Sequence, residues 1–184
     1  IADLDKNGFE DVFMGNSAGN AAVLIMNDGT NFKKSNQIVF EDESTFEDNT
    51  ATFFDADADG DLDLYVGSGA NSNTNYLKDR LYINNNNIFQ LKLEALPENK
   101  LITSSVVAYD YDADGDTDLF VGNYATQGNF GKTPTSYLLN NDGSGNFTKD
   151  ENFELNARVT DAKGHDVKQH GSKDLLFAPV WDKP

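Results

Sequence analysis

The sequence contains no cysteine, which excludes disulfide bonds and thiolate metal sites. Basic residues are also scarce: 14 Lys and Arg stand against 31 Asp and Glu, and the formal net charge is -17. This charge argues against nucleic acid or an anionic membrane as a partner, because both bind basic patches. No apolar run approaches the roughly 18 residues of a membrane helix, so we expect no membrane insertion.

Motifs of catalysis are scarce as well. Neither a GxSxG nucleophile motif nor a P-loop is present. The two histidines, His165 and His170, both lie at a degenerate copy of the acidic motif described below. We therefore favour a non-enzymatic role and leave enzymatic activity open.

The chain begins at Ile1 without a signal-like segment, and we expect it to be a piece of a longer protein. On this interpretation, the lack of a leader says nothing about location. Its 184 residues, 38% of them hydrophobic, suffice for one domain with a buried core.

Aspartate is concentrated in a repeated motif. It reads DLDKNGFED at residues 3–11, DADADGDLD at 55–63 and DYDADGDTD at 110–118, and a weaker copy, DVKQHGSKD, begins at Asp166. The copies begin 52, 55 and 56 residues apart, a pitch that indicates a repeat architecture. Two like charges about 4 Å apart repel by roughly 4 kcal/mol near a protein surface, so the crowded carboxylates need compensation.

The residues around each motif repeat too. DVFMG, DLYVG and DLFVG predict strands that end in glycine, and AAVLIMNDG, RLYINNNN and SYLLNNDGSG predict strands that run into hairpin turns. NFKKS, IFQLKL and NFTKD predict a further strand, and ATFF and SVVAY a strand before the next motif. About four strands per repeat predict an all-β fold, a β-propeller fragment of four-stranded blades. A β-sandwich is the alternative, but it does not account for the regular pitch.

The spacing of the acids fits a calcium loop. Side-chain oxygens at positions 1, 3 and 5, a glycine at position 6 and a carbonyl at position 7 can wrap one Ca²⁺ ion. An EF-hand would close with Glu at position 12 and enter a helix, but position 12 here is Met14, Val66 or Val121, in a predicted strand. The closing acid stands at position 9 instead. These are therefore calcium-binding DxDxDGxxD loops that lead into strands.

We predict three Ca²⁺ sites, in which the ion balances the crowded charge. The expected ligands are Asp3, Asp5, Asn7, Phe9 and Asp11 in the first loop, Asp55, Asp57, Asp59, Asp61 and Asp63 in the second, and Asp110, Asp112, Asp114, Asp116 and Asp118 in the third, with position 7 acting through its carbonyl. In the fourth copy Lys168 and His170 replace the middle acids, so we expect no metal there. Lys168 would either bridge the outer acids or point into solvent.

These motifs resemble FG-GAP/VCBS repeats, as in integrin α-subunit propellers, whose hallmark is DxDxDGxxD followed by a strand like DLFVG. LKDRLYINNN, DYDADGDTDLFVGNY, SYLLNNDGSGNFT and VTDAKGHD are similar to landmarks of secreted bacterial VCBS proteins of the ASPIC/UnbV-associated type. The resemblance covers nearly all of residues 1–184 and implies a calcium-binding propeller, usually of about seven blades. The chain holds three repeats and the opening of a fourth, so we expect the other blades outside it.

Two long connections are candidates for ligand binding. SGANSNTNYLKD and NYATQGNFGKTPT join the predicted second and third strands of the second and third repeats, on the face opposite the calcium loops. Long loops on a rigid scaffold are where binding concentrates, although a plain spacer is an equally open interpretation. The candidate residues are Asn73, Tyr76, Arg80, Tyr124, Gln127 and Lys132.

The sequence thus predicts a calcium-binding propeller scaffold of a secreted, periplasmic or cell-surface protein. Its expected role is non-enzymatic adhesion or binding of a protein or glycan ligand. The alternative is the propeller portion of a polysaccharide lyase or a similar carbohydrate-active enzyme, whose cleft would need a base and a neutralising group on one face.

Overall fold

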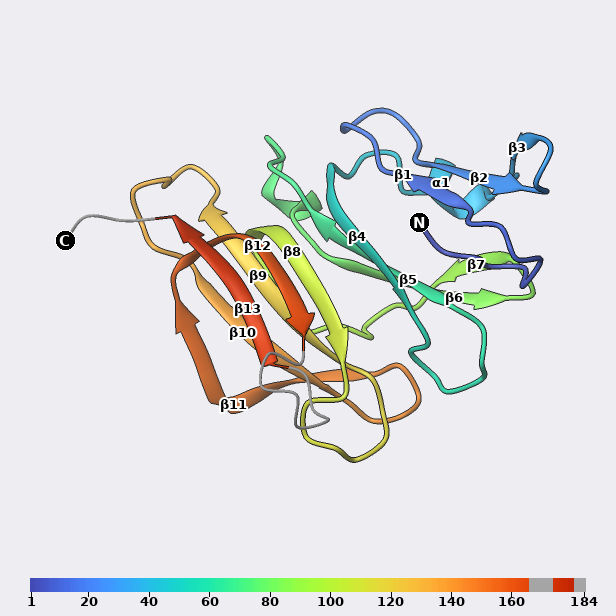
Figure 1. The fold of residues 1–184 in the computed structure, drawn as a ribbon. Helices are drawn as coiled ribbons and strands as arrows, with labels where there is room; N and C mark the ends of the chain where they lie inside the picture. Colours follow the sequence, from blue (N-terminus) through green and yellow to red (C-terminus); the bar gives the residue numbers. More distant parts are fainter. Residues whose placement is uncertain (166–173, 181–184) are drawn as a thin grey trace.

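The computed structural model describes residues 1–165 and 174–180 (Figure 1). Over these residues the strands form four antiparallel sheets, and each sheet is built from strands that are consecutive in the sequence. The described part is all-β apart from helix α1 (Ile38–Asp42) and the 3-10 turn η1 (Thr74–Tyr76), both in connections for which the sequence predicts no helix.

The sheets follow the predicted repeats. The first contains β1 (Val12–Met14), β2 (Val23–Asn27) and β3 (Phe32–Lys34). The second contains β4 (Asp48–Phe54), β5 (Asp63–Ser68), β6 (Arg80–Asn85) and β7 (Ile88–Leu91). The third contains β8 (Leu101–Tyr109), β9 (Asp118–Thr126), β10 (Thr135–Asn141) and β11 (Phe147–Asn156), and the fourth pairs β12 (Arg158–His165) with β13 (Asp174–Val180). Strand order equals chain order in each described sheet, which favours blade-like meanders over the sandwich alternative.

The central strands are buried on both faces because successive side chains of a strand point to opposite sides. Leu64 and Val66 of β5 belong to the core shared with the first sheet, whereas Tyr65 belongs to the core shared with the third. On β9, Leu119 faces the second sheet and Phe120 the fourth. This double burial explains the continuous apolar runs DLYVG and DLFVG.

The glycines that end these runs allow the sheets to approach each other closely. A Cβ added at Gly15, Gly67 or Gly122 would lie 2.6 Å from Asp48 Cβ, 2.7 Å from Thr103 Cγ2 or 2.8 Å from Val159 Cγ1, respectively. Each of these neighbours lies on the first strand of the next sheet. Successive sheets therefore pack face to face, in chain order.

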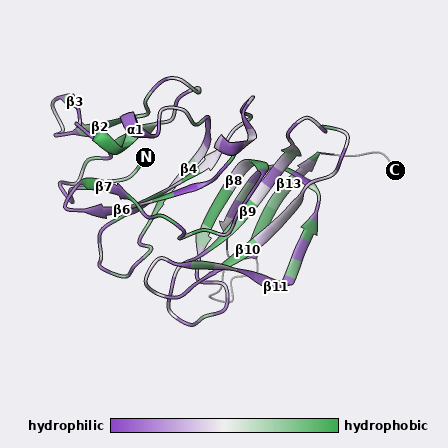
Figure 2. Cartoon of the chain, turned by 180° about the vertical axis from the view of Figure 1, so that it is seen from behind, coloured by the Kyte–Doolittle hydropathy of each residue, from purple (hydrophilic) through white to green (hydrophobic). Residues whose placement is uncertain are grey.

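Helix α1 fills the interface between the first two sheets. Its Phe40 is 3% exposed and packs edge-on against Phe13 and Tyr82, with ring centroids 5.4 Å apart in both pairs. Figure 2 shows hydrophobic residues in α1 and β7, which contribute to the interface between the first two sheets, and in β8, which contributes to the interface between the second and the third.

The connections divide between the two ends of the sheets. The second and third acidic loops join β4 to β5 and β8 to β9, whereas the long connections after β5 and β9 leave the opposite ends of the same sheets (Figure 1). Because β9 extends to Thr126, the second long connection is shorter than predicted and spans residues 127–134.

Candidate metal sites

Three groups of carboxylates lie in the acidic loops. They are Asp3, Asp5 and Asp11, then Asp55, Asp57 and Asp63, then Asp110, Asp112 and Asp118. In each group, one oxygen from every residue lies within 4.8 Å of the others. Oxygens that share one Ca²⁺ at about 2.4 Å are at most about 4.8 Å apart, so the spacing in each group is compatible with a shared ion. The structure thus brings positions 1, 3 and 9 together.

Each loop closes through its first aspartate and its glycine. In the second loop, the Gly60 amide donates a hydrogen bond to Asp55 Oδ2 at 3.0 Å, and the equivalent bonds measure 2.8 Å in the first loop and 3.2 Å in the third. Gly60 has a φ of 89°, a left-handed conformation that strains residues with a side chain. A Cβ at this position would meet no atom within 4 Å. Glycine is therefore required by the backbone conformation and not by a lack of space.

The side chains at position 5 are engaged in the turn. An oxygen of Asn7, Asp59 or Asp114 accepts a hydrogen bond from the backbone amide of position 7, at 2.8, 2.8 and 3.0 Å. Asp59 and Asp114 do not belong to the three-carboxylate groups. Metal ligation by position 5 and by the carbonyls of Phe9, Asp61 and Asp116 stays a prediction.

The closing aspartates, Asp11, Asp63 and Asp118, are completely buried. In the second loop, Asp63 accepts hydrogen bonds from the amides of Ala56 and Asn84, both at 2.7 Å. Burial, reinforced by the nearby acids of the same loop, raises the pKa of Asp63 to about 6 and also raises the pKa of Asp118. A cation in the loop would stabilise the charged form of these carboxylates.

Two carboxylate oxygens of the second loop are buried without a partner. Asp55 Oδ1 and Asp57 Oδ1 accept no hydrogen bond from any described residue. Such oxygens carry a desolvation cost that an ion would offset. A set of hard, anionic oxygen donors fits Ca²⁺.

Sequence reasoning missed three asparagines that hold the loops. Asn27, Asn84 and Asn141 each donate a backbone N–H to the closing aspartate, at 2.7, 2.7 and 2.9 Å. Their Nδ2 atoms donate to the carbonyl at position 8 of the same loop, at 3.2, 3.1 and 3.0 Å. The available signal was the asparagine that opens each hairpin turn, in NDG, NNNN and NNDG.

The fourth motif lies mostly outside the described residues. Asp166, Lys168 and His170 belong to that segment, whereas Asp174 is the first residue of β13. The described strands β12 and β13 flank the motif as the first and second strands of the other sheets flank theirs. Its expected lack of metal stays a prediction.

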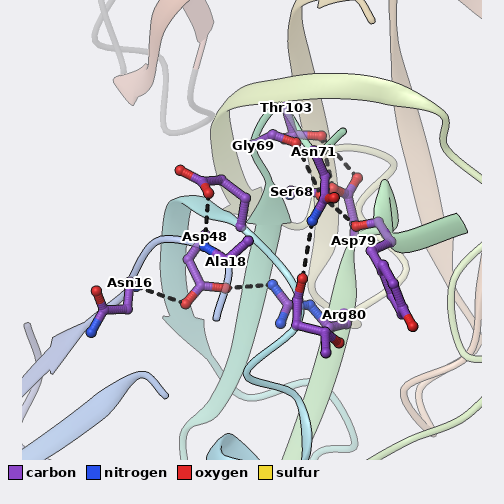
Figure 3. A network of polar contacts seen from close by, with 12 residues as sticks. Asn16, Ala18, Asp48, Ser68, Gly69, Asn71, Asp79, Arg80 and Thr103 are labelled. Carbon is purple, nitrogen blue, oxygen red and sulfur yellow. Dashed lines mark hydrogen bonds and ion pairs between the residues drawn. The ribbon is translucent and has the colours of Figure 1, made fainter. Parts of the chain in front are cut away.

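Among the ligand-binding candidates, Arg80 and Tyr76 contribute to internal packing. Arg80 is 6% exposed, and its Nη2 atom lies 2.5 Å from Asp48 Oδ1. Figure 3 shows the Asp48 side chain between Arg80 and Asn16. The Arg80 guanidinium lies over the Phe46 ring at 4.5 Å, and Tyr76 packs edge-on against the same ring at 5.4 Å. The structure therefore uses both side chains to hold the first long connection.

The other candidates lie nearer the solvent. Asn73, Tyr124 and Lys132 are exposed, and Gln127 is partly buried. The side chain of Asn73 caps η1 by accepting a hydrogen bond from the Asn75 amide at 3.1 Å. A ligand-binding role for these residues stays a prediction.

A cavity of about 530 Å³ lies beside the first long connection, lined in part by Phe46, Lys78 and residues 91–99. Asp79 on its wall accepts hydrogen bonds from the Tyr65 hydroxyl at 2.7 Å, the Ser68 amide at 2.8 Å and the Thr103 hydroxyl at 2.9 Å. Figure 3 shows Asp79 beside Ser68 and Thr103. Both carboxylate oxygens of Asp79 are thus engaged by protein donors.

The fold and these loops define a repeat protein of antiparallel sheets, in which an acidic loop precedes each of the strands β1, β5 and β9. A family model described as an FG-GAP-like repeat matches residues 3–66, which include the first two acidic loops. The match supports an FG-GAP-like repeat in this part of the chain. A comparison with curated proteins finds no match. Among the described residues, no helix combines the length and the hydrophobicity needed to cross a membrane.

Proposed function

We propose that the chain is a calcium-stabilised scaffold for ligand binding, built from blades of a β-propeller. One observation carries the proposal: Asp55 Oδ1 and Asp57 Oδ1 are buried without a described partner inside a carboxylate group that recurs in two further loops. Asp55, Asp57 and Asp63 would hold the ion of the second loop, and the aspartates at the same positions would hold those of the first and third.

The ion would supply positive charge that compensates the crowded carboxylates and would bind no substrate. Asp63 is also the first residue of β5, so fixing the loop fixes the start of a strand that is buried on both faces. The other end of β5 leads into the long connection at the opposite end of the sheet. In this way the ions would hold the binding loops from a distance.

The proposed ligand is a protein or a glycan, bound at the end of the sheets that carries the long connections. Asn73, Tyr124 and Lys132 are exposed there and offer polar and aromatic contacts. FG-GAP repeats are typical of extracellular proteins, and Ca²⁺ sites of extracellular modules work at about 0.1–1 mM, which supports a secreted, periplasmic or surface location.

Thermal unfolding with calcium and with a chelator tests the proposal. A site with free ion at 100 times its Kd contributes about 2.7 kcal/mol, and a domain of this size gains about 2–4 °C in Tm per kcal/mol. Three sites should therefore raise Tm by more than about 10 °C, whereas the same concentration of Mg²⁺ should give a smaller shift. Calorimetry should count three ions in the wild type and two in Asp57→Asn; identical melts with calcium and with chelator would refute the proposal.

A further inference from the structure

Asn141, the last residue of β10, is hydrogen-bonded to two acidic loops at once. Its Nδ2 atom donates to the carbonyl of Ala56 in the second loop at 2.8 Å and to the carbonyl of Thr117 in the third loop at 3.0 Å. Its Oδ1 atom accepts a hydrogen bond from the Gly145 amide at 3.2 Å. The residue is 7% exposed, so all the hydrogen-bonding groups of its amide are used inside the protein.

Both carbonyls belong to peptide groups that lead into candidate metal ligands. The Ala56 carbonyl shares a planar peptide with the amide of Asp57, and the Thr117 carbonyl shares one with the amide of Asp118. Fixing the carbonyl therefore fixes the plane from which the acidic residue starts. Asp57 and Asp118 each belong to a three-carboxylate group.

The other two loop-holding asparagines do not make this link. Among the described residues, the Nδ2 atoms of Asn27 and Asn84 each donate to a carbonyl of their own loop. The first and second loops meet through the pair between Lys6 Nζ and Asp61 Oδ1 at 3.1 Å, in which the Lys6 side chain is 67% exposed, and through a core that contains Leu4 of the first loop and contacts Leu62 of the second. Exposed ion pairs contribute little and are screened by salt.

We propose that Asn141 is a positioning residue that couples calcium binding in the second loop to calcium binding in the third. The inference rests on the proposed calcium function. An ion that orders Asp57 also orders the Ala56 carbonyl. This carbonyl fixes the side-chain amide of Asn141, which in turn holds the peptide group before Asp118. Less conformational freedom is then left to lose in the third loop, which gives positive cooperativity.

Hydrogen exchange of the whole 184-residue chain, followed by mass spectrometry during a Ca²⁺ titration, tests the coupling loop by loop. Protection of residues 110–118 reports the Kd of the third loop. Asp57→Asn should raise this Kd about five-fold or more, which is the lower range of allosteric couplings. In an Asn141→Ala background, Asp57→Asn should have no further effect on the third loop. Asn84→Ala is the matched control, because it removes a bond to one loop and should preserve the coupling.

A second variant gives a result even if Asn141→Ala does not fold. In Asp112→Asn the third loop is disabled, and Ca²⁺ bound in the second loop should still slow exchange in residues 110–118. Unchanged exchange there would overturn the coupling, and an equal effect of Asp57→Asn with and without Asn141 would overturn the role of Asn141 in it. If the three loops of the wild type titrate independently, only this inference fails. If calcium protects no loop, the proposed function fails and takes this inference with it.

Discussion

Replacing Gly67 by alanine tests how the second sheet packs against the third. The new Cβ would lie 2.6 Å from Thr50 Cγ2 and 2.7 Å from Thr103 Cγ2, although carbon atoms normally pack about 3.5–4.0 Å apart. The methyl group would thus overlap its neighbours by about 1 Å on both sides. Thr103 is fully buried and its hydroxyl is bonded to Asp79 at 2.9 Å, so it cannot turn away without losing that bond.

The magnitude follows from three contributions. Overpacking of a well-packed core costs about 1–3 kcal/mol. Loss of the bond from Thr103 to the Asp79 carboxylate would add about 1.5 kcal/mol if the side chain rotates. The lower entropy of the unfolded chain offsets about 0.4–1 kcal/mol, since Gly67 does not have a positive φ that alanine would strain. Together the three contributions give a net destabilisation of about 1.5–4 kcal/mol, which lowers Tm by about 3–16 °C.

Urea denaturation with calcium in excess measures this change, because the metal sites then stay filled in both proteins. Gly131→Ala is the matched control: the nearest atom to its added Cβ is Asn129 Oδ1 at 3.9 Å, and its φ is not positive. The control should change stability by less than about 1 kcal/mol. If Gly67→Ala is as stable as the wild type, the two sheets do not meet at this glycine.

Two buried charges give further tests. In calcium-free protein, the pKa of Asp63 is raised from 3.8 to about 6, so the folded state holds this proton more tightly than the unfolded chain does. Its contribution to stability is full below about pH 4 and is lost as pH rises through 6. Urea denaturation should detect this fall, and Asp63→Asn should remove it; an equal pH dependence in both proteins would contradict the assignment. Asp48→Ala leaves the Arg80 guanidinium buried without its carboxylate, so it should cost about 3–5 kcal/mol, and Asp48→Ala with Arg80→Met should recover part of this. A loss below about 1 kcal/mol in the single variant would show that the pair is unimportant.

The strands could be predicted from the sequence because the local pattern of apolar residues matches the burial of each strand in the fold. Runs such as DLYVG are continuously apolar because β5 and β9 face a sheet on both sides, and each run ends in the glycine that the next sheet requires. The acidic loops were readable for the same reason: the glycine, the turn and the closing aspartate all lie within nine residues.

Other features depend on contacts that no local pattern displays. Helix α1 has only five residues and gains its stability from burying Phe40 between two sheets. It is too short to show a helical period in the sequence. Arg80 was predicted as a ligand-binding candidate because it stands at a long connection. Its ion pair could not be read from the sequence, since its partner Asp48 lies on another strand, 32 residues away. The loop-holding asparagines could not be predicted because their separation in the sequence from the closing aspartate differs between repeats. The intervening connections have different lengths.

Closing the loop at position 9 rather than 12 has a structural consequence. In the second loop, the candidate ligand Asp63 is also the residue that starts β5, accepts two backbone hydrogen bonds and is completely buried. The next residue, Leu64, is already in the core shared with the first sheet, and Tyr65 is in the core shared with the third. A metal ion bound here would therefore lie one residue from the packed interior, not at the tip of a surface loop. For that reason its removal should loosen the contact between sheets as well as the loop itself, and calcium should affect the stability of the whole fold.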